Sequence, residues 1–240
     1  MTDVSRPQPW AEPSTNQAMF TRVAKRYDRL NLLMSVGRDH AWRRDLVDRV
    51  APPGTGRALD IGTGTGDLAI ALAGRASSVV AADLTPAMLA YAADKFDDDP
   101  TRTPIDPALS DALHLPYADA AFDVVVSGFV LRNLHDLAAA FREWHRVLRP
   151  GGRVGAVEMT HPPGRIRNSI QQGQLRFIAP VMARLVGAEP ADYKYISKSL
   201  ERFPTAPELA RLMEATGFGN ARYEYRMLGA VAIHVAVKPA

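Results

Sequence analysis

The feature that most constrains this chain is a glycine-rich turn after a short apolar run. The run R-A-L-D-I at 57–61 leads directly into G-T-G-T-G-D at 62–67. A buried strand that ends in closely spaced glycines and continues into a helix is typical of open α/β sheets, in which ligands bind at the carboxyl ends of the strands. The sequence therefore predicts a first parallel strand with a binding site at its end.

The middle of the chain repeats this alternation of strand and helix. Further strands are predicted at 79–83, 122–128 and 153–159, the last after a turn at 150–152, and helices at 66–73, 86–95 and 137–148. Such alternation predicts a mostly parallel sheet covered on both faces. The acidic, proline-rich stretch 97–107 leaves room only for a short strand at an edge.

The two ends of the chain depart from this repeat. Three prolines among polar residues at 1–14 predict a loose tail, and helical periodicity from Thr15 to residue 50 predicts helices that pack over one edge of the sheet. Helical stretches at 165–185 and 193–202 predict an inserted lid. A last helix at 207–216 precedes strands 221–227 and 230–238, whose two-residue connection predicts an antiparallel hairpin.

Composition narrows the function classes. The 240 residues include no cysteine, so disulfides, thiolate nucleophiles and cysteine-ligated metal sites are excluded. The 29 basic and 26 acidic residues are interspersed, so nucleic acid is not an expected partner. None of the 6 histidines forms an H-x-x-x-H pair, and no metal is expected. The absence of a long apolar run predicts a cytoplasmic protein.

Glycine spacing and charge indicate the kind of ligand. A dinucleotide fingerprint requires G-x-G-x-x-G, whereas Gly62, Gly64 and Gly66 run as G-x-G-x-G and two carboxylates, Asp60 and Asp67, flank the turn. Negative charge is unfavourable beside a pyrophosphate and favourable beside a sulfonium and an ammonium. The turn therefore favours S-adenosylmethionine over a dinucleotide. Asp83, which ends the second strand, is expected to accept hydrogen bonds from the ribose hydroxyls.

Two sets of motifs resemble known families. The first set resembles class I S-adenosylmethionine-dependent methyltransferases: D-I-G-T-G-T-G at 60–66, D-L-T-P-A-M-L at 83–89, D-A-L-H-L-P-Y at 111–117, F-D at 122–123 and L-R-P-G-G at 148–152. The second set is similar to the ubiquinone and menaquinone biosynthesis C-methyltransferases: F-x-x-V-A-x-x-Y-D-x-x-N at 20–31, M-S-x-G-x-D-x-x-W-R at 34–43, L-R-N at 131–133 and Y-x-Y-x-x-x-S-x-x-x-F-P at 193–204.

The resemblance implies a Rossmann-like seven-stranded sheet and methylation of a ring carbon of a prenylated quinol such as demethylmenaquinol, in menaquinone biosynthesis. With the residues singled out above, the expected cofactor contacts are Asp60, Gly62, Gly64, Thr65, Asp83, Asp111, Ala112 and Gly128. The expected organisation is a tail at 1–14 and one methyltransferase domain at 15–240. That domain divides into N-terminal helices at 15–50, a cofactor-binding core at 57–159, a lid at 165–203, and a C-terminal helix and hairpin at 206–240.

Methylation of a ring carbon needs a group that promotes phenolate formation, because a ring carbon is a poor nucleophile. Arg132 is the expected stabilising cation and Asn133 is expected to orient the ring. His135 or Asp28 is expected to take the proton.

A prenylated acceptor also implies an apolar entrance to the site and contact of the protein with the bilayer. Peripheral contact at the inner face of the membrane, through the N-terminal helices and the lid, would suffice. The sequence leaves open whether the chain forms a homodimer. Candidate entrance residues are Tyr27, Met34, Phe177, Met182, Tyr193, Tyr195 and Phe203.

Departures from the family pattern keep alternatives open. Val130 stands where the family usually has glycine, and a bulky side chain there would narrow the acceptor pocket. A methyltransferase for another phenolic or polyketide-like acceptor is therefore the alternative function. A nucleotide-binding dehydrogenase is disfavoured by Asp67, and a noncatalytic cofactor-binding scaffold is a further alternative.

Overall fold

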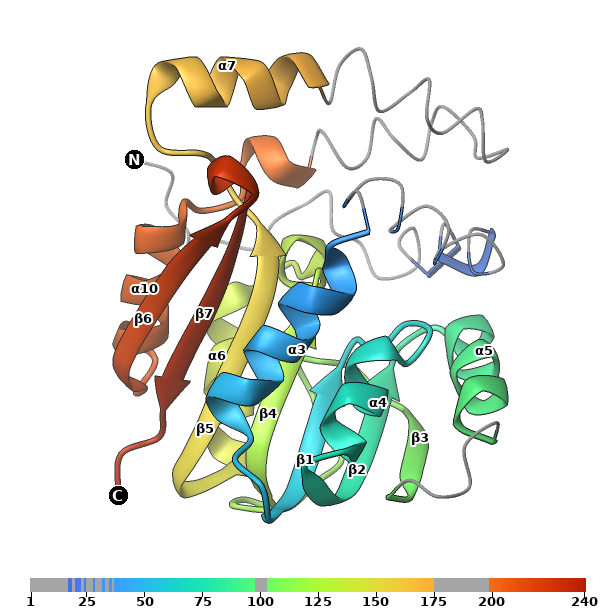
Figure 1. Cartoon of the computed structure of the whole chain (residues 1–240). Coiled ribbons are helices and arrows are strands. Elements are labelled where there is room, and N and C mark those ends of the chain that lie inside the picture. Colours follow the sequence, from blue (N-terminus) through green and yellow to red (C-terminus); the bar gives the residue numbers. More distant parts are fainter. Residues whose placement is uncertain are drawn as a thin grey trace.

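A computed structural model shows a seven-stranded sheet with helices on both faces (Figure 1). The structure describes residues 17–18, 20–22, 24, 28, 32, 35, 37–97, 103–174 and 199–240. The predicted tail at 1–14 and most of the lid beyond α7 lie outside these residues.

The elements follow one another in the predicted alternation. Five strands run parallel in the order β3-β2-β1-β4-β5, and β7 and β6 complete the sheet. In chain order the elements are α3 (Asp39–Val50), β1 (Thr55–Ile61), α4 (Asp67–Ala73), β2 (Ala76–Asp83), α5 (Pro86–Asp97), β3 (Ile105–Leu109), β4 (Phe122–Gly128), η2 (Leu131–Asn133), α6 (Leu137–Val147), β5 (Leu148–Met159), α7 (Arg165–Gly173), α10 (Ala206–Ala215), β6 (Gly219–Arg226), η4 (Met227–Gly229) and β7 (Val231–Val237).

Alternate residues of the central strands feed two apolar cores, because successive side chains point to opposite faces of a sheet. Ala58 packs with α3 and α4, whereas its neighbour Leu59 packs with α6 and α10. Aromatic side chains of α6, Phe141 and Trp144, fill the second core and meet edge to face at 5.4 Å between ring centroids. Both faces of the sheet are thus sealed, and the ends of its strands remain for binding.

Three sequence predictions hold closely. Strand β4 has the predicted bounds, β3 is a short edge strand that tolerates Pro107, and β6 pairs antiparallel with β7. An edge strand accommodates proline because the missing N–H costs no ladder hydrogen bond on the open side.

Two predictions about local geometry were wrong. The expected turn at 150–152 lies inside β5, where it forms an irregularity in the pairing with β4, and Lys238 supplies backbone hydrogen bonds to Gly151 and Gly152. Helix α3 was expected over an edge of the sheet, but it packs on a face, against α4, β4, β5 and β7. Leu46 and Val50 fit there because Gly155 of β5 has no side chain to exclude them.

His234, in the middle of β7, makes the stability of the fold depend on pH. The side chain is 1% exposed and its Nε2 donates to the Ala206 carbonyl oxygen at 3.0 Å. Burial lowers the pKa of His234 to about 4, from an ordinary value of 6.5. The folded state therefore resists protonation at pH values where the unfolded chain binds a proton.

We expect the free energy of unfolding to fall by about 3 kcal/mol through this group as the pH drops from 6.5 to 4. Well above pH 6.5 His234 is neutral in both states and contributes no slope. Urea unfolding at a series of pH values measures this, with His234→Gln as the comparison because Gln retains an amide donor. Identical slopes for the two proteins would contradict the assignment.

Candidate active site

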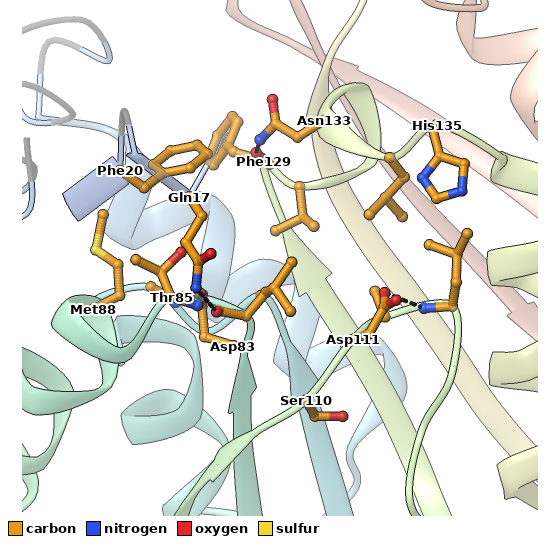
Figure 2. A pocket seen from close by; sticks show the side chains of 17 residues that line it. Gln17, Phe20, Asp83, Thr85, Met88, Ser110, Asp111, Phe129, Asn133 and His135 are labelled. Atoms are coloured by element: carbon orange, nitrogen blue, oxygen red, sulfur yellow. Dashed lines mark hydrogen bonds between the residues drawn. The ribbon is translucent and has the colours of Figure 1, made fainter. Parts of the chain in front are cut away.

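A cleft opens where the parallel strands end (Figure 2). It has an empty volume of about 770 Å³, part of it open to solvent, and its walls come from the segments that follow β1, β2, β3 and β4. A smaller hollow of about 300 Å³ adjoins the glycine turn, and Gly62 and Gly64 line both spaces. The position matches the rule that open α/β sheets bind ligands at the carboxyl ends of their strands.

The glycine turn is close-packed against its neighbours. Gly62 and Gly66 have φ values of +67° and +87°, in the left-handed region that favours glycine. A Cβ on Gly62 would lie 2.3 Å from Cγ2 of Val130, and one on Gly66 would lie 2.5 Å from Cε1 of Phe96. Both glycines are therefore required by sterics as well as by conformation.

Asp83 ties the first two strand ends together. Its Oδ2 accepts from the Gly64 N–H at 2.9 Å and its Oδ1 from the Thr85 N–H at 2.8 Å. Burial raises the pKa of Asp83, while these backbone donors oppose the rise. Each carboxylate oxygen keeps a further lone pair, and the side chain lines the cleft.

Asp60 is a buried carboxyl group at the smaller hollow. It is 1% exposed, and burial raises its pKa to about 7. Oδ2 accepts from the Thr63 hydroxyl at 2.7 Å, whereas Oδ1 has no hydrogen-bond partner among the described residues. In the cleft, the hydroxyl of Ser110 is likewise buried and without a described partner. Two unsatisfied polar atoms therefore border the two spaces.

A network of charges surrounds the glycine turn. Lys95 pairs with Asp28 at 2.6 Å and with Asp67 at 2.8 Å, while Arg43 pairs with Asp39 at 2.5 Å and lies 3.7 Å from Asp67. Burial alone would lower the pKa of Lys95, but the two carboxylates outweigh it and the pKa is raised. Asp28 also accepts from the Thr65 hydroxyl at 2.5 Å. The network joins the N-terminal segment and α3 to the turn.

The same network explains a compact acidic group. Asp39, His40 and Asp67 bring ligand atoms within 4.8 Å of one another. The cations of Arg43 and Lys95 already balance the two carboxylates, so the group needs no metal ion.

The segment after β4 carries three of the predicted catalytic residues, Arg132, Asn133 and His135. Phe129 adopts a left-handed φ of +60°, which turns the chain into η2, and the Arg43 guanidinium lies 5.7 Å from its ring centroid. Asn133 and His135 line the cleft. Arg132 pairs at 2.5 Å with Glu158, which is 1% exposed on β5. Glu158 also accepts from the Met159 N–H, so it fixes Arg132 to the end of β5.

The predicted residues divide among three places. The main cleft brings together Gly62, Gly64, Asp83, Asp111, Ala112, Asn133 and His135. The smaller hollow has Asp60, Thr65 and Gly128 in its lining. Asp28 and Arg132 line neither space, since each is engaged in the ion pairs described above.

Sequence reasoning missed part of the wall. Gln17 donates from Nε2 to the Leu84 carbonyl oxygen at 2.9 Å, and Phe20 packs with Met88 on the same side of the cleft (Figure 2). No local pattern links residues 67 positions apart, so only the folded chain reveals the contact between Gln17 and Leu84. Thr85, Ser110 and Phe129 were also missed, although Thr85 and Phe129 closely follow the predicted strands 79–83 and 122–128.

Of the candidate residues for an apolar entrance, only Phe203 lies among the described residues. It is 6% exposed and belongs to the core beneath α6 and α10, so its predicted place in an entrance was wrong. Tyr27, Met34, Phe177, Met182, Tyr193 and Tyr195 lie outside the described residues.

The site fits S-adenosylmethionine in its chemistry. Asp60 and Asp83 offer carboxylate oxygens, Asp60 with one orphaned, and the main cleft has apolar walls suited to an adenine ring. Among the described residues, Asp67 lies in the first turn of α4, where a carboxylate disfavours a pyrophosphate at the helix N-terminus.

Comparisons with known proteins agree with this geometry. A model described as the ubiE/COQ5 methyltransferase family matches residues 11–238. The chain is 39% identical to a demethylmenaquinone methyltransferase of Roseiflexus sp. (strain RS-1), with 99% of each chain covered. It is 40% identical to a demethylmenaquinone methyltransferase of Thermus thermophilus, with 92% of this chain and 100% of the relative covered.

Solved structures show the same fold at low identity. An S-adenosylmethionine-dependent methyltransferase from Thermotoga maritima aligns with a TM-score of 0.65 at 18% identity, covering 92% of this chain and 99% of that one. Phosphoethanolamine N-methyltransferase 2 from Haemonchus contortus, solved with S-adenosylhomocysteine, aligns with a TM-score of 0.62 at 19% identity, covering 83% and 53%.

Replacing Asp83 tests the larger cleft. Asp83→Asn keeps the size of the side chain but turns an N–H₂ group toward one of the two backbone donors. We expect roughly ten- to a hundredfold weaker binding of S-adenosylmethionine, because a charge-assisted acceptor is lost. Isothermal titration calorimetry measures this, with Asp106→Asn on the exposed side of β3 as the control. Unchanged affinity in Asp83→Asn would remove Asp83 from the site.

Proposed function

The chain belongs to the ubiE/COQ5 methyltransferase family, and from this we propose that it methylates a ring carbon of a prenylated quinol such as demethylmenaquinol, in menaquinone biosynthesis. It is a methyltransferase that uses S-adenosylmethionine. The observation that carries the proposal is the cleft at the carboxyl end of the sheet, which joins carboxylate acceptors at the glycine turn to Asn133 and His135.

We propose that the cofactor lies across the glycine turn. When bound, S-adenosylmethionine supplies an electrophilic methyl group on a cationic sulfur. Asp83 would accept hydrogen bonds from the ribose, Asp111 and Ala112 would border the adenine, and Gly62, Gly64, Thr65 and Gly128 would allow close approach. Asp60 would face the cationic amino-acid part through the smaller hollow. Removal of water from these carboxylates strengthens each of these electrostatic contacts.

We propose that the acceptor ring lies near Asn133 and His135. A phenol becomes a better carbon nucleophile when its proton leaves, so a base within reach of the hydroxyl accelerates the reaction. His135 lines the cleft and Asp28 does not, since both oxygens of Asp28 are held by Thr65 and Lys95. We therefore propose that His135 accepts the phenol proton, directly or through water. Asp28 is proposed to hold the glycine turn in place.

Arg132 contributes through the Glu158 ion pair in this proposal. Glu158 is buried, so the pair holds η2 in place and orients the cation at the edge of the acceptor site. Loss of one partner would leave the other charge buried and uncompensated. Because Arg132 lines neither binding space, we propose that it acts on the reaction by positioning the segment that carries Asn133.

The acceptor side of the cleft also favours one alternative. Val130 lies directly over Gly62 and lines the cleft, where it reduces the space beside Asn133. A smaller phenolic or polyketide-like acceptor is therefore the second candidate. We also propose that the protein contacts the membrane peripherally. For its oligomeric state, a homodimer is proposed as the alternative to a monomer. Among the described helices, none is long and apolar enough to cross a bilayer.

A methyl-transfer assay distinguishes these acceptors. Isotopically labelled S-adenosylmethionine is supplied with chemically reduced demethylmenaquinone in detergent, beside a panel of simple phenols, and products are analysed by mass spectrometry. We expect label in menaquinone. Label only in a phenol would support the second candidate, and cofactor binding without any labelled product would contradict both.

A second prediction separates chemistry from structure at Arg132. We expect Arg132→Ala to lower kcat at least about a hundredfold while the Kd for S-adenosylmethionine changes by less than about threefold, because Arg132 lines neither binding space. Steady-state kinetics and calorimetry measure the two quantities, and Arg132→Lys tests whether charge alone restores turnover. Equal losses in kcat and affinity would indicate a purely structural residue.

A further inference from the structure

Two apolar side chains protrude from neighbouring segments at the end of the molecule that carries the cleft. Leu228 in the β6–β7 turn is 82% exposed, and Ile166 near the start of α7 is 79% exposed. They are the most exposed large apolar side chains among the residues that the structure describes. Single exposed apolar residues are common, but these two belong to segments in contact. A Cβ on Gly229 would lie 2.7 Å from Cδ of Pro163.

The turn that presents Leu228 is held in an unfavourable backbone conformation. Met227 and Leu228 have φ values of +48° and +57°, and Gly229 follows at +101°. Non-glycine residues pay for this conformation, and asparagine adopts it more readily than leucine. The turn therefore displays an apolar side chain at a position where a polar residue would both be solvated and cost less strain.

Hydrogen bonds to neighbouring segments hold this turn in place. The Ala230 N–H closes it onto the Met227 carbonyl oxygen at 3.1 Å, and Thr160 donates its N–H to Ala230 at 2.9 Å. The side chain of Gln171, which is buried, donates to the Thr160 carbonyl oxygen at 3.1 Å. The end of β5, the turn and α7 are thus joined.

The position of Leu228 and Ile166, and the charge of the helix beside them, indicate what kind of surface they contact. β7 runs antiparallel to β5, with Val231 beside Met159, so the β6–β7 turn lies at the carboxyl end of β5, the end of the sheet at which the parallel strands finish (Figure 1). Helix α7 has the sequence R-I-R-N-S-I-Q-Q-G, with two arginines and no acidic residue. Arg167 is exposed. Apolar side chains beside basic ones favour a bilayer with anionic headgroups, where the former enter the acyl boundary and the latter remain at the phosphates.

We propose that Leu228 and Ile166, with the exposed Arg167 of α7, form a membrane-docking surface that inserts into an anionic bilayer and turns the cleft toward it. This inference rests on the proposed function, because an acceptor dissolved in the bilayer is what makes such an orientation useful. A docking point at the end of the sheet that carries the cleft would bring the cleft close to the bilayer in which the acceptor is dissolved.

Vesicle sedimentation of the full chain tests this without any acceptor. We expect binding to vesicles of phosphatidylcholine with phosphatidylglycerol, weaker binding to phosphatidylcholine alone, and weakening as salt is raised. Leu228→Asn and Ile166→Ser should each lower the partition coefficient roughly tenfold. Leu228→Asn should keep its melting temperature or raise it, because Asn suits the left-handed turn.

The matched control is Leu109→Asn, which removes a leucine that is 62% exposed on β3, the edge strand farthest from β6 and β7 in the strand order. It should leave vesicle binding unchanged. Equal binding by wild type and Leu228→Asn, or an equal loss in Leu109→Asn, would overturn the proposal. So would dissociation of a dimer by Leu228→Asn in sedimentation velocity, which would assign the surface to a second copy of the chain.

Activity separates this proposal from the proposed function. With a water-soluble, short-chain demethylated quinol in solution, Leu228→Asn should turn over at the wild-type rate. Vesicle binding lost without loss of this activity supports docking, whereas absence of quinol methylation in every protein would contradict the function and leave the binding result standing.

Discussion

The hydrogen bonds of one partly buried carboxylate, Asp83, join two strand ends at the binding end of this sheet. Asp83 accepts from the backbone of Gly64 and from that of Thr85, so the turns that follow β1 and β2 cannot separate without exposing two donors and a charge. Backbone groups buried without partners are costly. The path of the glycine turn, the start of α5 and the floor of the cleft all follow from this pair of contacts.

A second layer of electrostatics secures the turn from outside. Lys95 from α5, Arg43 from α3 and Asp28 from the N-terminal segment meet around Asp67 and Thr65. Each cation faces carboxylates that would otherwise repel one another near Asp60 and Asp83. The arrangement leaves the interior of the site acidic while its periphery is balanced, which suits a cationic ligand.

Local sequence patterns predicted the fold well where a short stretch of sequence determines the structure. The β-branched run at 122–128 became β4, and the short connection after residue 227 forced an antiparallel pair. Patterns failed where distant segments decide. The glycines at 151 and 152 lie in β5 because Lys238 continues the ladder, and α3 lies on a face because Gly155 leaves room for it. The polarity of the glycine turn indicated the cofactor, yet the partner of Arg132 and the contacts of Gln17 and Phe20 required the folded chain.

The N-terminal contacts have a thermodynamic consequence. Gln17 bonds the turn after β2, and Asp28 bonds the turn after β1, so the N-terminal segment and a ligand in the cleft touch the same two turns. Such linkage is reciprocal. A ligand that stabilises these turns also strengthens the contacts of the N-terminal segment with them, and those contacts strengthen ligand binding by the same free energy. The contacts of Gln17 and Asp28 thus contribute to the affinity of the site for its ligand.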